Sequence, residues 1–131
     1  MKKSILLVII VLTTMISYAQ SDLEKDAAFD QNTSNVTYKI FPTKNMWNFI
    51  KLNTKTGQMW QVQFDVNGKD RFQTDLNILP LVIKEKQVDN RFTLYPTQNT
   101  WTFILLDQID GNTWQVQWAI KSKDRMVIPI K

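Results

Sequence analysis

The stretch GNTWQVQW, residues 111–118, has a near-copy earlier in the chain, GQMWQVQF, residues 57–64. In both copies aromatic and valine side chains alternate with glutamines, which is the period of a β-strand with one apolar and one polar face. A shift of 54 aligns residues 38–77 with 92–131 without a gap, and 15 of the 40 pairs are identical. A match of this length indicates an internal duplication.

Each copy predicts a four-stranded antiparallel meander. The strands are expected at 36–41, 46–53, 58–66 and 71–76, and again at 91–95, 100–107, 112–120 and 125–130. Pro42 and Pro96 end the first strand because proline has no amide hydrogen for the ladder. Gly57 and Gly111 offer the positive φ that tight hairpins need.

Eight strands in two like halves predict an all-β fold. We expect two tandem meander repeats packed as one small barrel or sandwich with pseudo-twofold symmetry, since either arrangement protects sheet edges. A pair of propeller-like blades is the alternative. The expected domain covers residues 36–131, with repeat one at 36–77, a connector at 78–90 and repeat two at 91–131.

The first 19 residues have the layout of a secretory signal peptide. Lys2 and Lys3 precede an apolar run, and small residues stand before a cut after Ala19. The run is shorter than the roughly 20 apolar residues of a membrane span. We therefore expect a periplasmic or secreted protein that starts at Gln20, without a membrane span, and with residues 20–35 as a polar tether.

The composition excludes several kinds of chemistry. The chain has no cysteine and no histidine, which rules out Ser-His-Asp and Cys-His catalysis, thiol redox chemistry and the usual zinc sites. No metal site or cofactor is predicted, and the modest positive charge is no argument for nucleic acid. A small hydrolase would need facing carboxylates. Asp65, Asp107 and Asp110 are the candidates that a fold could bring together, although nothing in their spacing indicates that it does, and no catalytic residue is assigned.

Four tryptophans recur at equal positions in the two copies, which is typical of core residues. They are Trp47, Trp60, Trp101 and Trp114. An open face on any of them would instead favour stacking on a sugar or a peptide. Trp118 aligns with Phe64, which also favours packing.

Glutamines and one charged pair repeat as well. Gln61, Gln63, Gln115 and Gln117 lie on the polar side of the third strand. They favour either amide pairs across neighbouring strands or recognition of a sugar or a peptide backbone. Asp70-Arg71 and Asp124-Arg125 predict an ion pair at the start of the fourth strand.

The segment FTLYPTQNTWTFILLDQIDGNTWQVQW, residues 92–118, resembles the repeat of small secreted proteins from Bacteroidetes-type bacteria. The strings YPTxNxW and GxxWQVQ carry the likeness, which implies an exported β-protein and no particular chemistry. LNTKTGQMW is more weakly similar to a turn of quinoprotein propeller blades. Its glycine-to-tryptophan spacing departs from theirs, so no quinone site is implied.

These observations predict an exported, non-catalytic binding or interaction protein. Its partner is expected to be a glycan, a peptide or another protein, and the candidate contact residues are Gln61, Gln63, Gln115, Gln117, Trp47 and Trp101. The alternative is a secreted or periplasmic inhibitor or immunity-type protein that blocks an enzyme. Its contact loops would be the turns PTKN, PTQN, TKTG and QIDG.

Overall fold

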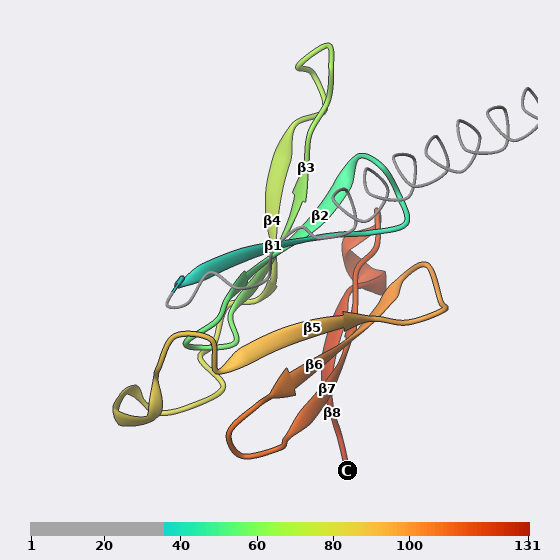
Figure 1. Cartoon of the computed structure of the whole chain (residues 1–131). Helices are drawn as coiled ribbons and strands as arrows, with labels where there is room; N and C mark the ends of the chain where they lie inside the picture. The colour runs from blue at the N-terminus through green and yellow to red at the C-terminus, as the bar shows by residue number, and fades with distance from the viewer. Residues whose placement is uncertain (1–35) are drawn as a thin grey trace, which may run out of the picture. The chain divides into compact units, whose positions relative to one another are not determined.

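The strands of the computed structural model follow the duplicated sequence strand by strand (Figure 1). The structure describes residues 36–131, so the predicted signal peptide (1–19) and tether (20–35) lie outside the described residues. One sheet contains β1 (Tyr38–Pro42), β2 (Asn48–Asn53), β3 (Met59–Gln63) and β4 (Phe72–Asn77), in that order. The other contains β5 (Phe92–Pro96), β6 (Thr102–Asp107), β7 (Thr113–Gln117) and β8 (Met126–Ile130).

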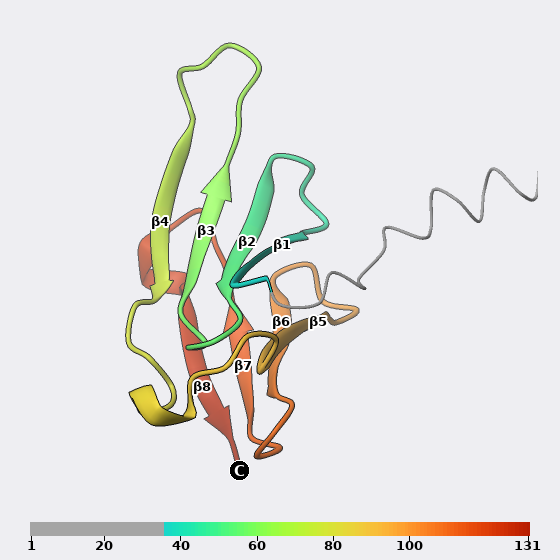
Figure 2. The same cartoon turned by 60° about the vertical axis from the view of Figure 1, so that its left-hand side comes forward.

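Strand pairing is antiparallel throughout and repeats at the 54-residue shift. Ile50 pairs with Phe41 and Gln61 in the first sheet, and its equivalent Ile104 pairs with Tyr95 and Gln115 in the second. Two open four-stranded sheets face each other as a sandwich, and the barrel is not closed. The prediction of an all-β fold with two like meanders is confirmed. The two views show β5–β8 lying beside β1–β4 (Figure 2).

The hairpin between β2 and β3 shows why glycine stands in both copies. Gly57 and Gly111 have a φ of 75°, as expected for this turn, and each donates its amide to the strand that precedes it. A Cβ on Gly57 would also lie 2.7 Å from the Leu81 side chain. Leu81 belongs to the connector, which contains a short 3₁₀ helix, η1 (Lys84–Lys86), and packs against this turn. A second one, η2 (Ser122–Asp124), precedes β8.

Each sheet has a front face and a back face, defined here by equivalent residues. The front face carries Tyr38, Ile40, Phe49, Trp60 and Val62 in the first sheet, and Phe92, Leu94, Phe103, Trp114 and Val116 in the second. The back face carries Phe41, Ile50, Leu52, Met59 and Gln61 in the first sheet, and Tyr95, Ile104, Leu106, Thr113 and Gln115 in the second.

The core lies between the back face of the first sheet and the front face of the second. Ile50, Leu52 and Met59 are buried from the first sheet, and Phe92, Leu105 and Trp118 from the second. The two repeats therefore share strand order and register but bury opposite faces. Front-to-back stacking results when the same rotation and translation relates each sheet to the next, as in neighbouring blades of a propeller.

This arrangement separates residues that the sequence treats alike. Trp118 is 0% exposed, whereas its equivalent Phe64 is 42% exposed. The prediction that the four repeated tryptophans are core residues is wrong for Trp47 and Trp101, which are exposed. Trp114 packs against the core, while Trp60 lies on the front face of the first sheet. The predicted packing role of Trp118 is confirmed.

Backbone and side-chain hydrogen bonds join the two sheets at their ends. The Thr54 carbonyl accepts from the Phe92 amide at 2.8 Å, and Arg125 Nη1 donates to Thr74 Oγ1 at 3.3 Å. These bonds fix how the second sheet lies on the first. Within residues 36–131, no helix is long and apolar enough to cross a bilayer.

Candidate functional site

The turns PTKN and PTQN are built by the same hydrogen bonds. In the first, Thr43 Oγ1 accepts from the Asn45 amide at 3.1 Å, and Asn45 Oδ1 accepts from the Trp47 amide at 2.9 Å. In the second, Thr97 Oγ1 and Asn99 Oδ1 accept from the equivalent amides at 3.1 and 2.8 Å. Threonine and asparagine side chains thus hold the backbone in a turn where β-pairing stops.

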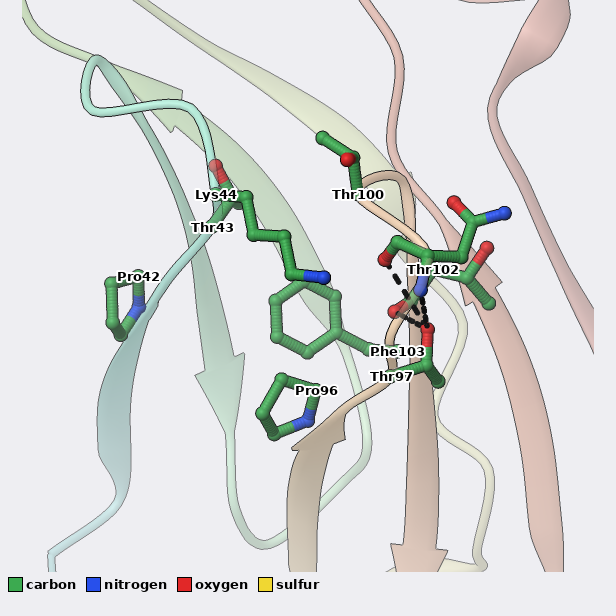
Figure 3. Close-up of a pocket in the computed structure, with 9 residues that line it drawn as sticks. Pro42, Thr43, Lys44, Pro96, Thr97, Thr100, Thr102 and Phe103 are labelled. Atoms are coloured by element: carbon green, nitrogen blue, oxygen red, sulfur yellow. Dashed lines mark hydrogen bonds between the residues drawn. The ribbon is translucent and has the colours of Figure 1, made fainter.

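A small pocket of about 120 Å³ lies between these two turns (Figure 3). We call it the turn pocket, and its lining residues are Pro42, Thr43, Lys44, Pro96, Thr97, Asn99, Thr100, Thr102 and Phe103. The Lys44 side chain extends from the first turn across the Phe103 ring (Figure 3). Its Nζ donates to the carbonyl oxygen of Gln98 on the second turn. Lys44 therefore joins the two repeats at this site.

The turn pocket combines apolar walls with polar groups. Pro42, Pro96 and Phe103 are its apolar lining residues, and Lys44, Asn99 and the threonines are its polar ones. A pocket for a drug-sized ligand has about 300–1,000 Å³, so this one accommodates the edge of a larger molecule. The lining contains no carboxylate and no nucleophile–base pair. Its groups can hold a polar ligand.

Trp47 and Trp101 belong to the same two turns. The Trp47 ring packs on Phe64 with centroids 5.2 Å apart, and the Trp101 ring packs on Trp118 at 4.7 Å. Both tryptophans are exposed, although neither lines the turn pocket. The structure thus places two of the predicted contact residues on the turns that form the pocket, one on each repeat.

The four repeated glutamines do not share one surface. Gln61 is fully buried between the sheets, and its Nε2 donates to Asn48 Oδ1 at 2.8 Å. Gln63 and Gln117 donate to the carbonyls of Asp70 and Asp124 at 3.0 and 2.9 Å, tying the last hairpin of each repeat.

Gln115 lies on the back face of the second sheet, which faces away from the core. The back face is buried in the first sheet and open in the second, so Gln61 lies between the sheets while Gln115 lies on the outside. The cross-strand pairing expected for these amides is present between Gln61 and Asn48.

The repeated Asp–Arg pairs do not form ion pairs. Within residues 36–131, no salt bridge joins Asp124 to Arg125 or Asp70 to Arg71. Arg125 instead donates from Nε to the Ala119 carbonyl at 2.8 Å and from Nη2 to the Ile120 carbonyl at 3.0 Å. The predicted ion pair is wrong because this guanidinium closes the turn before η2 and β8 through backbone oxygens.

The three acidic residues considered for a hydrolase do not form one cluster. Asp107 and Asp110 accept from the same nitrogen, Arg91 Nη2, at 2.8 and 2.6 Å. Asp65 accepts from the Lys69 amide at 2.9 Å in the hairpin after β3. Among the described residues no group of three acidic side chains could hold a metal ion. A pair of carboxylates held by one arginine is not arranged as an acid and a base on two sides of a sugar.

Arg91 and Asp107 form a buried ion pair that sequence analysis missed. Burial raises the pKa of Asp107, but hydrogen bonds from Arg91 and from the amides of Ile109 and Asp110 hold that pKa below its ordinary value. The hydrogen bond to Asp107 raises the pKa of Arg91. Both groups therefore stay charged. In the first repeat the positions of Arg91 and Asp107 are occupied by Thr37 and Asn53, which are uncharged. The sequence signal for the pair was therefore a charge that is not repeated, at the ends of two neighbouring strands.

Comparison of the chain with family models, curated proteins and solved structures gives no significant match. The functional argument therefore rests on the geometry of the two sheets and the turn pocket. The contact of Lys44 with the second turn was missed because it depends on how the sheets stack. The strings PTKN and PTQN form the two turns that line the pocket.

Proposed function

We propose that this chain is an exported, non-catalytic binding protein that holds the edge of a glycan in the turn pocket. The supporting observation is the pocket lining, in which an ammonium, an amide and hydroxyl groups surround apolar walls. Sugars present hydroxyls that donate and accept, together with C–H faces that pack on rings. The Thr100 hydroxyl matches the first property because a hydroxyl both donates and accepts, and the exposed rings of Pro42 and Pro96 match the second.

The exposed tryptophans extend this proposed site. Trp47 and Trp101 lie on the turns that form the pocket, and aromatic rings give a glycan apolar contact area at low cost in side-chain entropy. A polymer that enters the pocket with one residue can then contact a ring with the next. A peptide or a protein is the alternative ligand for the same pocket, and a binding screen distinguishes these ligands from a glycan.

Replacing Lys44 with methionine is expected to weaken glycan binding about tenfold or more. Hydrogen bonds to charged groups contribute roughly 1.5–3 kcal/mol, and every 1.4 kcal/mol is about tenfold in Kd. The measurement is titration calorimetry with the best oligosaccharide from a panel of bacterial and plant glycans. Lys121→Met removes an exposed lysine on another loop and serves as the matched control. Equal affinities for both variants would remove the turn pocket from the site.

A second candidate function is inhibition of an enzyme, and the β3–β4 hairpin favours it. This hairpin extends beyond the rest of its sheet (Figure 2), and Val66 is exposed at its tip. Asp65 orders the turn by accepting from the amides of Lys69 and Asp70. Loss of partner binding in Val66→Asp, with Lys44→Met unaffected, would favour this function over glycan binding.

Export is expected to remove residues 1–19, because their layout is that of a signal peptide. Intact-mass spectrometry of protein from the periplasm or medium should give a chain that begins at Gln20. Cyclisation of that glutamine would lower the mass by about 17 Da, the mass of the ammonia lost. Recovery of the full 131-residue chain outside the cytoplasm would contradict the prediction.

A further inference from the structure

The chain contains one contact between a back face and a front face. The two sheet faces that remain open are again one front face and one back face. The back face of the first sheet covers the front face of the second. The front face of the first sheet and the back face of the second are left over. One copy of the molecule therefore carries both partners of the contact that it forms internally.

Equivalent residues on the two front faces show how much apolar surface is left open. Phe92 is 1% exposed in the core, whereas its equivalent Tyr38 is 55% exposed. Leu94 is 4% exposed, and its equivalent Ile40 is 56% exposed. Large contiguous apolar patches on a soluble protein mark interaction sites.

The open back face of the second sheet is also apolar. Tyr95 is exposed there, while its equivalent Phe41 packs against the core. Ile128 and Ile130 of β8 are exposed on the same face, and Ile104 and Leu106 of β6 are only partly buried. Their equivalents in β2, Ile50 and Leu52, are fully buried.

The open front face also carries three polar residues. Gln73 and Asp75 are exposed on β4, one of the two edge strands, where β8 has Val127 and Pro129. Lys51 stands at the position of Leu105, but its Nζ reaches over the Trp60 ring to Gln73 Oε1 at 2.7 Å. The ammonium thus lies over the Trp60 ring, 4.6 Å from its centroid, as a cation–π contact. The polar side chains of β4 border this face on one side, and a polar border is a feature of protein interfaces.

We propose that copies of this chain stack head to tail, with the open front face of one copy on the open back face of the next. The open faces continue the interface inside the chain, because they present the positions equivalent to its two sides, most of them apolar. A contact between unlike faces closes into a ring when its rotation permits. Propellers close with about 4–8 four-stranded sheets, so a ring would contain about two to four copies.

Stacking of this kind would also repeat the turn pocket between copies. Inside the chain, Lys44 of the first turn meets Gln98 of the second. Between copies, the turn at 96–99 of one chain would lie beside the turn at 42–45 of the next. A ring would then present one pocket for each contact. The assembly itself does not depend on what the pocket binds.

The first test is the mass of the processed chain, residues 20–131, in solution. Light scattering after size-exclusion chromatography, supported by native mass spectrometry, should give one discrete species of two to four chains. A monomer at every soluble concentration would overturn the proposal, and a polydisperse polymer would overturn the closed ring.

The second test uses two variants that each disable one face. Ile40→Glu places a charge on the open front face, and Tyr95→Glu places one on the open back face. Both side chains are exposed within one chain, so both variants should fold, which circular dichroism and thermal unfolding would check. Each variant alone should be monomeric, and Val66→Glu at the hairpin tip is the control that should assemble like the unchanged protein.

Mixing the two variants separates head-to-tail stacking from other association. Ile40→Glu keeps an intact back face and Tyr95→Glu keeps an intact front face. The mixture should therefore form a one-to-one dimer that cannot grow further. If each face paired with itself, Ile40→Glu alone would still dimerise through its back face. That result, or a mixture that stays monomeric, would overturn the proposal.

Discussion

Replacing Trp118 with alanine is expected to destabilise the fold by about 3–5 kcal/mol, the range for large buried aromatic residues. The indole is fully buried, packs on Trp101, and donates its Nε1 hydrogen to the Thr100 carbonyl at 3.1 Å. Alanine would leave a cavity between the sheets and an unpaired carbonyl beside it. Denaturant unfolding followed by circular dichroism gives the free energy of unfolding.

Two control variants show whether burial is the cause. Trp101→Ala removes the same residue type from an exposed position and should cost clearly less. Phe64→Ala removes the half-exposed equivalent and should cost about 1 kcal/mol within one chain, close to the range of surface substitutions. The series is measured at low protein concentration, so that contacts between chains do not contribute. Equal costs for all three variants would contradict the front-to-back arrangement.

Replacing Arg91 with threonine, the residue at the equivalent position of the first repeat, is expected to cost about 3–5 kcal/mol. Arg91 is buried, and its Nη2 lies 2.8 Å from the buried carboxylate of Asp107. Removing one partner of a buried pair leaves an uncompensated charge, which costs more than the pair contributes. Unfolding at neutral pH measures the loss.

The first repeat also provides the control for this change. Asn53 Oδ1 accepts from the Lys55 amide at 3.0 Å, as Asp107 Oδ1 does from the Ile109 amide. The double variant Arg91→Thr, Asp107→Asn therefore copies a neutral arrangement that the fold already contains. It should recover more than half of the lost free energy of unfolding. A double variant no more stable than the single one would show that the loss is due to packing.

The free energy of unfolding should depend differently on pH in the Arg91→Thr variant and in the unchanged protein. The pKa of Asp107 is lower in the folded protein than its ordinary value of 3.8. Its contribution to stability is therefore present above that value and is lost as pH falls through the folded pKa. Without Arg91, its hydrogen bond and its charge no longer lower the pKa of Asp107, so that pKa is higher in the variant than in the unchanged protein. The single variant should then gain stability relative to the unchanged protein as the pH is lowered towards 4.

The strands could be predicted from the sequence because the signals for each strand and turn lie within the strand or turn itself. The alternation around Trp60 and Trp114, the prolines after the first strand and the turn glycines define one meander, and the second copy repeats them. The faces that meet could not be read from this pattern, because both copies carry the same alternation. Gln61 and Gln115 have the same neighbours in sequence, yet only Gln61 is buried.

The differences between the copies contained the missing information. Leu105, Val127 and Pro129 replace Lys51, Gln73 and Asp75, so the front face of the second copy is the more apolar one. Such a bias indicates which of two equivalent faces is covered. The turn pocket could not be found in this way, because its lining depends on the distance between two turns. The loops were identifiable, and the contact of Lys44 across them was not.

Within residues 36–131, every strand is hydrogen-bonded only to strands that directly precede or follow it in the chain. All of its β-pairing thus closes short loops, for which the entropy of closure is small. Sandwiches of Greek-key topology must bring distant segments together first, and they fold slowly for that reason. Here each sheet can form hairpin by hairpin, and only the contact between the sheets joins segments far apart in the chain. Because paired strands are neighbours in the chain, the β-pairing of this protein has a low contact order for an all-β fold.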